Sequence, residues 1–192
     1  MKCNLPILWK DEEWLTVNPE RISGAQVSVN NYLRKSQRLY QGKKILHIGI
    51  GNSSVYRELK DVFKQIDGIT NTQQELEAGR RLSDEYGIYL INKYNPDEFK
   101  YIDNNYDVIV DVNLKSFACC NEHWLSYLKA VIGKLKVGGR LISHTAGFGG
   151  YPSDFDNSMT MNELHKLLEP NCLLFEIKHL DDGYYTFIIE KT

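Results

Sequence analysis

A surplus of basic residues, long apolar runs and Cys-x-x-Cys pairs are all missing from this 192-residue sequence. Lysine and arginine number 23 against 25 aspartate and glutamate residues, a net charge of −2, and basic residues cluster only in pairs such as Lys43-Lys44. Because a phosphate backbone attracts basic surfaces, we expect no nucleic acid partner. Apolar runs fall far short of the roughly 18 residues of a membrane span, and the amino terminus lacks a signal peptide core. These absences predict a cytoplasmic protein with no membrane partner.

Cysteine and proline are also sparse. The four cysteines, at positions 3, 119, 120 and 172, form no cluster with zinc-binding spacing, so we expect no metal. Adjacent Cys119 and Cys120 are compatible with redox chemistry, but free cysteines more often behave as small buried hydrophobic residues. With only five prolines, the sequence leaves no room for a long disordered or collagen-like segment.

Apolar segments with strand and helix periodicity alternate along the chain, without repeats or linkers. Such alternation is typical of a parallel sheet with helices on both faces. We expect Gly87 to end the third helix and Val137-Gly138-Gly139 to end the fourth. The predicted strands cover 44–50, 65–69, 88–94, 106–112 and 140–144, and the predicted helices cover 22–39, 55–63, 72–86, 124–135 and 161–168.

Two further apolar segments, 173–180 and 184–190, flank the turn sequence Asp181-Asp182-Gly183. A hairpin forces antiparallel pairing, so one of its strands must run against the rest of the sheet. The expected fold is therefore α/β, with a mostly parallel seven-stranded sheet and an antiparallel C-terminal hairpin strand. We predict a single domain over 1–192, in which 1–41 form a helical cap on a core of 42–192.

A glycine-containing turn follows the first strand, in the sequence ILHIGIGNSSVYREL. Gly49 and Gly51 allow backbone to approach a ligand closely and to adopt positive φ. The amides at the start of the next helix offer hydrogen-bond donors to the ligand. This turn is the natural place for a small-molecule site, because ligands of open α/β sheets bind at the carboxyl ends of the strands.

The same turn resembles the first motif of class I S-adenosylmethionine-dependent methyltransferases, where it surrounds the methionine part of the cofactor. GITNTQQELEAGR is similar to the second motif of this family, YDVIVDV to its fourth strand, and LKVGGRLISH to the helix end and fifth strand. The resemblance covers roughly 42–192 and implies a three-layer Rossmann-like fold with S-adenosylmethionine as cofactor. It assigns cofactor contacts to His47, Gly49, Gly51, Asn52, Ser53, Thr70, Asn71, Gln74, Asn95, Asp97 and Asp111.

Three positions depart from the family pattern. His47 replaces a residue that is commonly acidic, Ser53 replaces the third glycine, and Thr70 replaces the acid that usually holds the ribose hydroxyls. Some lipid-modifying members carry the same Gly-apolar-Thr sequence with a glutamine soon after, so Thr70 with Gln74 can still serve. Asp67 is the nearest carboxylate, but it lies three positions earlier, on the opposite face of a regular strand. It can substitute only if Gly68 interrupts the pleat.

Methyl transfer is an in-line displacement that requires a positioned nucleophile and, for a hydroxyl acceptor, a base. His144, at the end of the fifth strand, is the first candidate, and His123 precedes the helix after the fourth strand. The loop TAGFGGYPSDFDN after His144 is glycine-rich and aromatic, which predicts a mobile cover to which Tyr151 and Asp154 belong. Asp111, at the tip of the fourth strand, either faces the reacting methyl group or caps the next segment.

The expected activity is methyl transfer from S-adenosylmethionine to a small molecule, such as a metabolite, a sugar or a secondary-metabolite precursor. The fourth strand lacks the Asn-Pro-Pro-aromatic signature, which disfavours DNA bases and glutamine amides as acceptors. Few residues remain for a substrate domain, so the amino-terminal segment, the loop after the fifth strand, or the second chain of a homodimer must complete the acceptor site.

Three other readings stay open. The departures at His47, Ser53 and Thr70 suit a non-catalytic binding or scaffolding subunit that retains the fold. GNSSVYREL followed by YDVIVDV is also similar to polyamine aminopropyltransferases, although those enzymes usually have an acid after the second strand and a longer chain. A nicotinamide dehydrogenase fits least, because Ser54 interrupts the Gly-x-Gly-x-x-Gly pattern and the hairpin ending is wrong for it.

Overall fold

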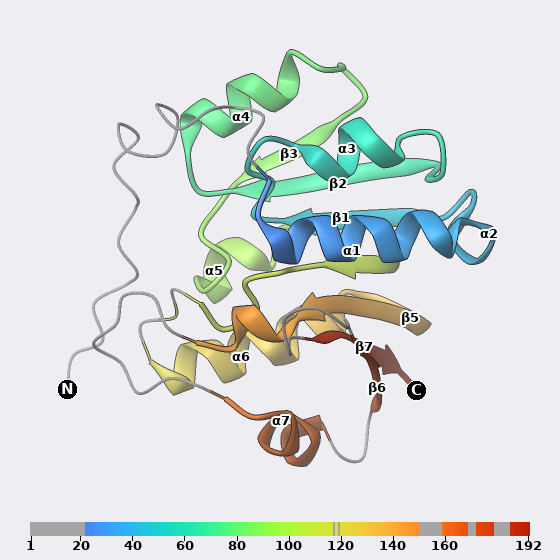
Figure 1. The fold of residues 1–192 in the computed structure, drawn as a ribbon. Coiled ribbons are helices and arrows are strands. Elements are labelled where there is room, and N and C mark those ends of the chain that lie inside the picture. Colours follow the sequence, from blue (N-terminus) through green and yellow to red (C-terminus); the bar gives the residue numbers. More distant parts are fainter. Residues whose placement is uncertain (1–21, 117, 119, 150–158, 169–171, 179–184) are drawn as a thin grey trace.

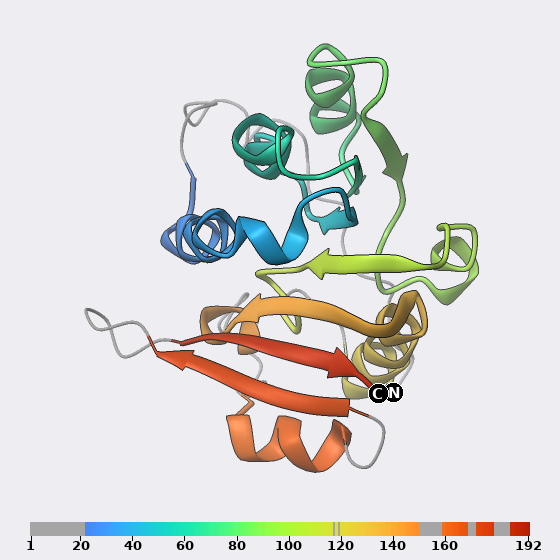
Figure 2. The same cartoon turned by 90° about the vertical axis from the view of Figure 1, so that its right-hand side faces the viewer.

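A seven-stranded sheet forms the centre of the protein (Figure 1). The structure is a computed structural model that describes residues 22–116, 118, 120–149, 159–168, 172–178 and 185–192. The strand order is β3-β2-β1-β4-β5-β7-β6, and β1 to β5 pair in parallel. β7 runs against β5 and β6 (Figure 2), which confirms the antiparallel C-terminal strand. The bounds are β1 Lys44–Ile48, β2 Gln65–Thr70, β3 Gly87–Leu90, β4 Tyr106–Val110, β5 Leu135–His144, β6 Cys172–Lys178 and β7 Tyr185–Lys191.

Helices pack on both faces of this sheet, in the three layers expected of a Rossmann-like fold. Apolar side chains of α1, α3 and α4 join one core, and those of α5, α6 and α7 join the other. The bounds are α1 Gly24–Lys35, α2 Gln37–Tyr40, α3 Ser54–Leu59, α4 Gln73–Arg80, α5 Pro96–Phe99, α6 Asn121–Gly133, α7 Met161–Leu168 and the 3₁₀ helix η1 Thr145–Phe148.

Alternation along β1 separates the two cores. Ile45 packs with the α1 and α3 side, whereas Leu46 and Ile48 pack with the α5 and α6 side. Residues two apart in a strand share a face, so His47 points to the side of Ile45. The backbone therefore directs a buried imidazole toward α1.

The strand order reverses between β1 and β4, which are neighbours in the sheet. β2 and β3 lie to one side of this point, and β5 lies to the other. In open α/β sheets, the segments that leave the carboxyl ends of the two strands at such a reversal run in opposite directions. The space between these segments is the usual ligand site. Here the turn after β1 and the loop 111–120 after β4 leave the sheet from adjacent strands.

Several element boundaries differ from the predictions. The predicted helix 22–39 divides at Ser36 into α1 and α2, and the predicted strand 88–94 ends at Leu90. α4 ends at Arg80 instead of extending to residue 86, and Gly87 begins β3 instead of ending the helix. Gly138 and its neighbours lie inside β5, which starts at Leu135 and bends where its pairing with β4 shifts register. The short helices α5 and η1 were not predicted, because four-residue helices carry too few positions to show a period. The division into cap and core remains a prediction, since residues 1–21 lie outside the described structure.

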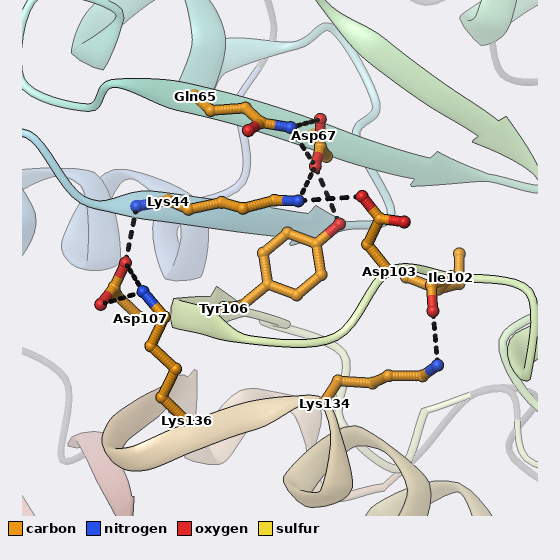
Figure 3. A network of polar contacts seen from close by, with 9 residues as sticks. All are labelled: Lys44, Gln65, Asp67, Ile102, Asp103, Tyr106, Asp107, Lys134 and Lys136. Atoms are coloured by element: carbon orange, nitrogen blue, oxygen red, sulfur yellow. Dashed lines mark hydrogen bonds and ion pairs between the residues drawn. The ribbon is translucent and has the colours of Figure 1, made fainter.

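A network of charged side chains joins the amino ends of the strands, away from the carboxyl-end site (Figure 3). Asp67 is 3% exposed and accepts a hydrogen bond from the Tyr106 hydroxyl at 2.8 Å. Its carboxylate also lies 3.3 Å from the ammonium of Lys44, the first residue of β1. β2 is regular through Gly68, which pairs with β1 and β3 in register. Asp67 is therefore neither a solvated side chain nor a substitute for the missing ribose acid.

We expect Tyr106→Phe to lower the free energy of unfolding by about 1.5 to 3 kcal/mol, because it removes a hydrogen bond to a buried carboxylate. Cofactor affinity should not change, since the network lies at the opposite end of the strands. Urea unfolding measures the first quantity, and calorimetric titration measures the second. Tyr101→Phe is the matched control, because Tyr101 is 75% exposed. A loss of affinity in Tyr106→Phe would contradict this separation.

Candidate functional site

The turn after β1 passes through left-handed backbone conformations. The φ angles are +74° at Gly49, +49° at Gly51 and +61° at Ser53. The amides of Gly49 and Ile50 donate to the carbonyl of Ile69 at 2.9 and 3.1 Å, which ties the turn to β2. A Cβ atom at either glycine would meet no described atom within 4 Å. Among the described residues, the turn thus presents backbone that no side chain covers at the two glycines, and their positive φ angles agree with the prediction.

Ser53 departs from the family pattern in sequence but not in conformation. Its φ of +61° is in the left-handed region that favours glycine, and its amide donates to the carbonyl of Ile50 at 2.7 Å. A non-glycine residue adopts this conformation at a cost of about 1 to 3 kcal/mol, and such costs are typical of functional sites. Serine therefore preserves the path of the turn.

His47 is buried at the end of a hydrogen-bond chain from α1. Its Nε2 lies 3.1 Å from the Oε1 of Gln26, whose amide nitrogen donates to Asn30. Because this arrangement presents an acceptor to the imidazole, His47 carries its proton on Nε2, and Nδ1 is left as an acceptor. Nδ1 is buried without a hydrogen-bond partner. Burial lowers the pKa of His47 to about 4, so the ring is neutral at physiological pH.

An acid from α4, which the sequence prediction missed, lies against the end of β2. The hydroxyl of Thr70 donates to the carboxylate of Glu75 at 2.5 Å, and Glu75 is 7% exposed. Thr72, the N-cap of α4, accepts from the Glu75 amide at 3.2 Å. The signal was the capping pair Thr72 and Glu75, which places this carboxylate in the first turn of the helix, beside the strand end. Half-buried Gln74 precedes it, and its Oε1 is buried without a hydrogen-bond partner.

Asp111 is the anchor of a buried charged cluster after β4. Its Oδ2 accepts from the Lys93 ammonium at 2.7 Å and from the Tyr127 hydroxyl at 2.6 Å, while Oδ1 accepts from the Asn113 amide at 3.0 Å. The Asp111 and Lys93 side chains are only 1% and 13% exposed. Burial lowers the pKa of Lys93, an effect that Asp111 opposes. Three donors already occupy the carboxylate, so the geometry supports the capping role for Asp111.

The remaining predicted cofactor contacts are distributed along the same end of the sheet. Asn52 and Asn71 are half-buried in the segments after β1 and β2. Asn95 caps α5: its Oδ1 accepts from the Asp97 amide at 3.1 Å, and its amide nitrogen donates to Glu98 at 2.8 Å. Asp97 itself is exposed and pairs with Lys100. The adenine contacts assigned to Asn95 and Asp97 stay predictions.

Two of the predicted catalytic residues, Asp111 and His144, lie at neighbouring strand ends. The Asp111 amide donates to the carbonyl of Ile142 at 3.1 Å, and the Asp111 carbonyl accepts from the Ser143 hydroxyl at 2.6 Å. His144 is 2% exposed, and its Nδ1 accepts from the Ala146 amide at 3.2 Å, as the cap of η1. A neutral His144 therefore holds its proton on Nε2, which favours a donor role over the base predicted from the sequence. His123 is half-buried in the first turn of α6. Tyr151, with Asp154, lies outside the described residues, so its predicted role is not tested.

S-adenosylmethionine fits the polar groups at this rim. Buried acceptors without partners, such as His47 Nδ1 and Gln74 Oε1, destabilise a protein by about 1 to 3 kcal/mol each. The cofactor presents the complementary donors, namely an ammonium, two ribose hydroxyls and an adenine amino group. The free space at Gly49 and Gly51 provides room for it against the backbone.

Metal-ligating clusters and membrane-spanning helices are both absent from the part of the chain that the structure describes. There, no group of three or more His, Cys, Asp or Glu side chains could hold a metal ion. In the same residues, no helix is both long and apolar enough to cross a membrane.

Solved structures with a similar fold include several methyltransferases. The N-methyltransferase NodS from Bradyrhizobium japonicum WM9, in complex with S-adenosyl-L-homocysteine, has a TM-score of 0.69 at 12% identity, over 96% of this chain and 94% of that chain. The amino pentose methyltransferase CalS10 from Micromonospora echinaspora has a TM-score of 0.65 at 11% identity, over 86% and 89%. An rRNA methylase from Streptococcus thermophilus has a TM-score of 0.56 at 18% identity, over 89% and 98%. At these identities the likeness shows the fold alone.

Sequence comparison gives the family. No curated protein sequence matches the chain significantly. The family model described as mycolic acid cyclopropane synthetase matches residues 14–182, which is most of the chain. The chain therefore belongs to the mycolic acid cyclopropane synthetase family, within the class I S-adenosylmethionine-dependent methyltransferases.

Proposed function

We propose that this protein transfers the sulfonium methyl group of S-adenosylmethionine to a small-molecule acceptor, such as a metabolite, a sugar or a secondary-metabolite precursor. The observation that carries the proposal is the turn at Gly49 and Gly51, whose left-handed backbone meets no described atom at either Cβ position. The strand that leads into this turn contains His47, whose Nδ1 is a buried acceptor without a partner among the described residues. A homodimer, the absence of a nucleic acid partner and a cytoplasmic location are part of the same proposal.

Polar groups at the ends of β1 and β2 would hold the cofactor. Thr70 and Glu75 form a hydroxyl and carboxylate pair at the strand end, where the family usually places a single acid for the ribose hydroxyls. The buried acceptors of His47 and Gln74 would receive donors of the cofactor. When bound, S-adenosylmethionine would supply an electrophilic methyl group that passes directly to the acceptor with S-adenosylhomocysteine as the leaving group, so no protein nucleophile is needed.

The contribution of the protein to the reaction is then mainly orientation. Asp111 and Lys93 fix the start of the loop after β4 at the switch point, next to the turn of Gly49 and Gly51. His144 would donate a hydrogen bond from Nε2 to the acceptor, because its Nδ1 is engaged with Ala146. His123 is the candidate that remains for a base.

Calorimetric titration with S-adenosylhomocysteine tests the cofactor part of the proposal. We expect saturable binding by the wild type. The dissociation constant of Glu75→Ala should be about 10- to 100-fold larger, because this variant loses charge-assisted hydrogen bonds. Glu77→Ala is the matched control, because Glu77 is exposed on the same helix. If the wild type releases no heat at millimolar ligand, the enzyme proposal fails and the non-catalytic subunit takes its place.

A further inference from the structure

The loop after β4 contains a buried lysine without an anionic partner. Lys115 is 8% exposed, and its ammonium forms no ion pair or hydrogen bond with a described residue. Two other lysines of low exposure have partners: Lys93 pairs with a carboxylate, and Lys134 donates to two backbone carbonyls. The Lys115 Nζ lies instead 5.2 Å from the centre of the Trp124 ring. A ring face attracts a cation but cannot accept all three of its hydrogen bonds.

Trp124 is a second donor without an acceptor. Its side chain is 2% exposed in the first turn of α6, and its Nε1 is buried with no hydrogen-bond partner. An indole N–H can only donate, as can the ammonium of Lys115. Two side chains in contact thus offer donors and no acceptor, which is the chemistry that an anion complements.

The position of Lys115 is fixed by the backbone around it. The amides of Lys115 and Ser116 both donate to the carbonyl of Gly147 in η1, at 2.8 and 3.1 Å. A Cβ at Gly147 would lie 2.1 Å from the carbonyl oxygen of Val112, so only glycine permits this approach. The donors are therefore anchored at the carboxyl ends of β4 and β5, across the switch point from the cofactor residues of β1 and β2.

One carboxylate from another element interacts electrostatically with Lys115, but the hydrogen bonds of this carboxylate go to other groups. Glu163 of α7 accepts from the amide and the hydroxyl of Thr160, at 2.7 and 2.9 Å, as a helix cap. Its charge raises the pKa of Lys115 through space, while burial of the ammonium lowers that pKa by more. Glu163 therefore leaves the hydrogen-bonding capacity of Lys115 unused.

We propose that Lys115 and Trp124 together bind an anionic group, a carboxylate or a phosphate, of the methyl acceptor. This inference rests on the proposed function and narrows its substrate class, because it places the charged group of the acceptor over β4 and β5. The cofactor would occupy the other side of the switch point, over β1 and β2. An anchored anion would orient the rest of the acceptor toward the methyl group.

Nuclear magnetic resonance of isotope-labelled protein tests the anion site directly, without a known substrate. The indole N–H signal of Trp124, assigned with Trp124→Phe, is followed while sodium phosphate or sodium acetate is added at constant ionic strength. We expect a saturable downfield shift with at least one anion, and the stronger of the two identifies the group. Lys115→Met, which keeps the apolar stem, should weaken binding about tenfold or more, whereas Lys115→Arg should remain within a few-fold of the wild type.

Two further measurements keep the outcome decisive. Lys129→Met removes an exposed charge from the same α6 helix and should leave the titration unchanged. Binding of S-adenosylhomocysteine should be equal in Lys115→Met and the wild type, so a cofactor failure is recognised separately. No saturable shift with either anion would overturn the inference. So would a shift that survives in Lys115→Met or disappears equally in Lys129→Met.

Discussion

Gly51→Val should abolish measurable binding of S-adenosylhomocysteine, which means a dissociation constant at least about a hundredfold larger than that of the wild type. Two effects act together at this position. The φ of +49° is unfavourable for a β-branched residue, and the valine side chain would fill the space that now borders the backbone. Calorimetric titration measures the affinity, and circular dichroism should remain native because no described atom obstructs the new side chain.

Gly138→Val separates backbone strain from lost space. Gly138 has a φ of +73°, and a Cβ there also meets nothing within 4 Å among the described atoms. It lies in the amino-terminal part of β5, away from the carboxyl-end rim. Both variants should lose similar stability in urea, but only Gly51→Val should lose affinity. Retained affinity in Gly51→Val would mean that the cofactor binds elsewhere.

Hydrophobic periodicity predicted every strand of the sheet, and the hairpin turn predicted that one of the last two strands is antiparallel; the structure shows that this strand is β7. Strand and helix ends were less predictable, because local contacts decide them. Gly87 begins β3, where a Cβ would lie 2.7 Å from a carboxylate oxygen of Asp67. In the sequence, Gly68 also suggests a break in the strand, yet it lies in a regular strand. Glycine is required there because Ile50 and Tyr86 pack where a side chain would be. In both cases packing, and not a turn, explains the glycine.

The glycine turn was predictable because its residues are consecutive, whereas pairs formed between separate elements were not. Thr70 stands where the family usually has an acid, but Glu75 of the next helix places its carboxylate within hydrogen-bond distance of the Thr70 hydroxyl. Asp111 was identified at the tip of β4, but its partner Lys93 follows β3, three strands away in the sheet. The Lys93 ammonium reaches Asp111 because the loop after β3 crosses toward β4.

Asp111→Asn should be the most destabilising single substitution that we expect, with a loss of about 3 to 5 kcal/mol in the free energy of unfolding. The variant preserves shape but removes the negative charge beside the buried ammonium of Lys93. An ammonium left without its partner costs far more than the intact pair contributes. The same change deprives the Tyr127 hydroxyl of a charged acceptor. Urea unfolding followed by circular dichroism measures the effect.

The double variant Asp111→Asn with Lys93→Met distinguishes pairing from packing. Methionine keeps an unbranched apolar stem but removes the ammonium, which lies 4.9 and 5.0 Å from the centres of the Tyr94 and Tyr127 rings. If the unpaired ammonium is the cause, the double variant should recover most of the stability lost by Asp111→Asn. If the Asp111 hydrogen bonds to Asn113 and Tyr127 are the cause, it should recover little. Cofactor affinity in the double variant then reports whether the charges at the switch point act on the ligand or only hold the loop after β3 against β4.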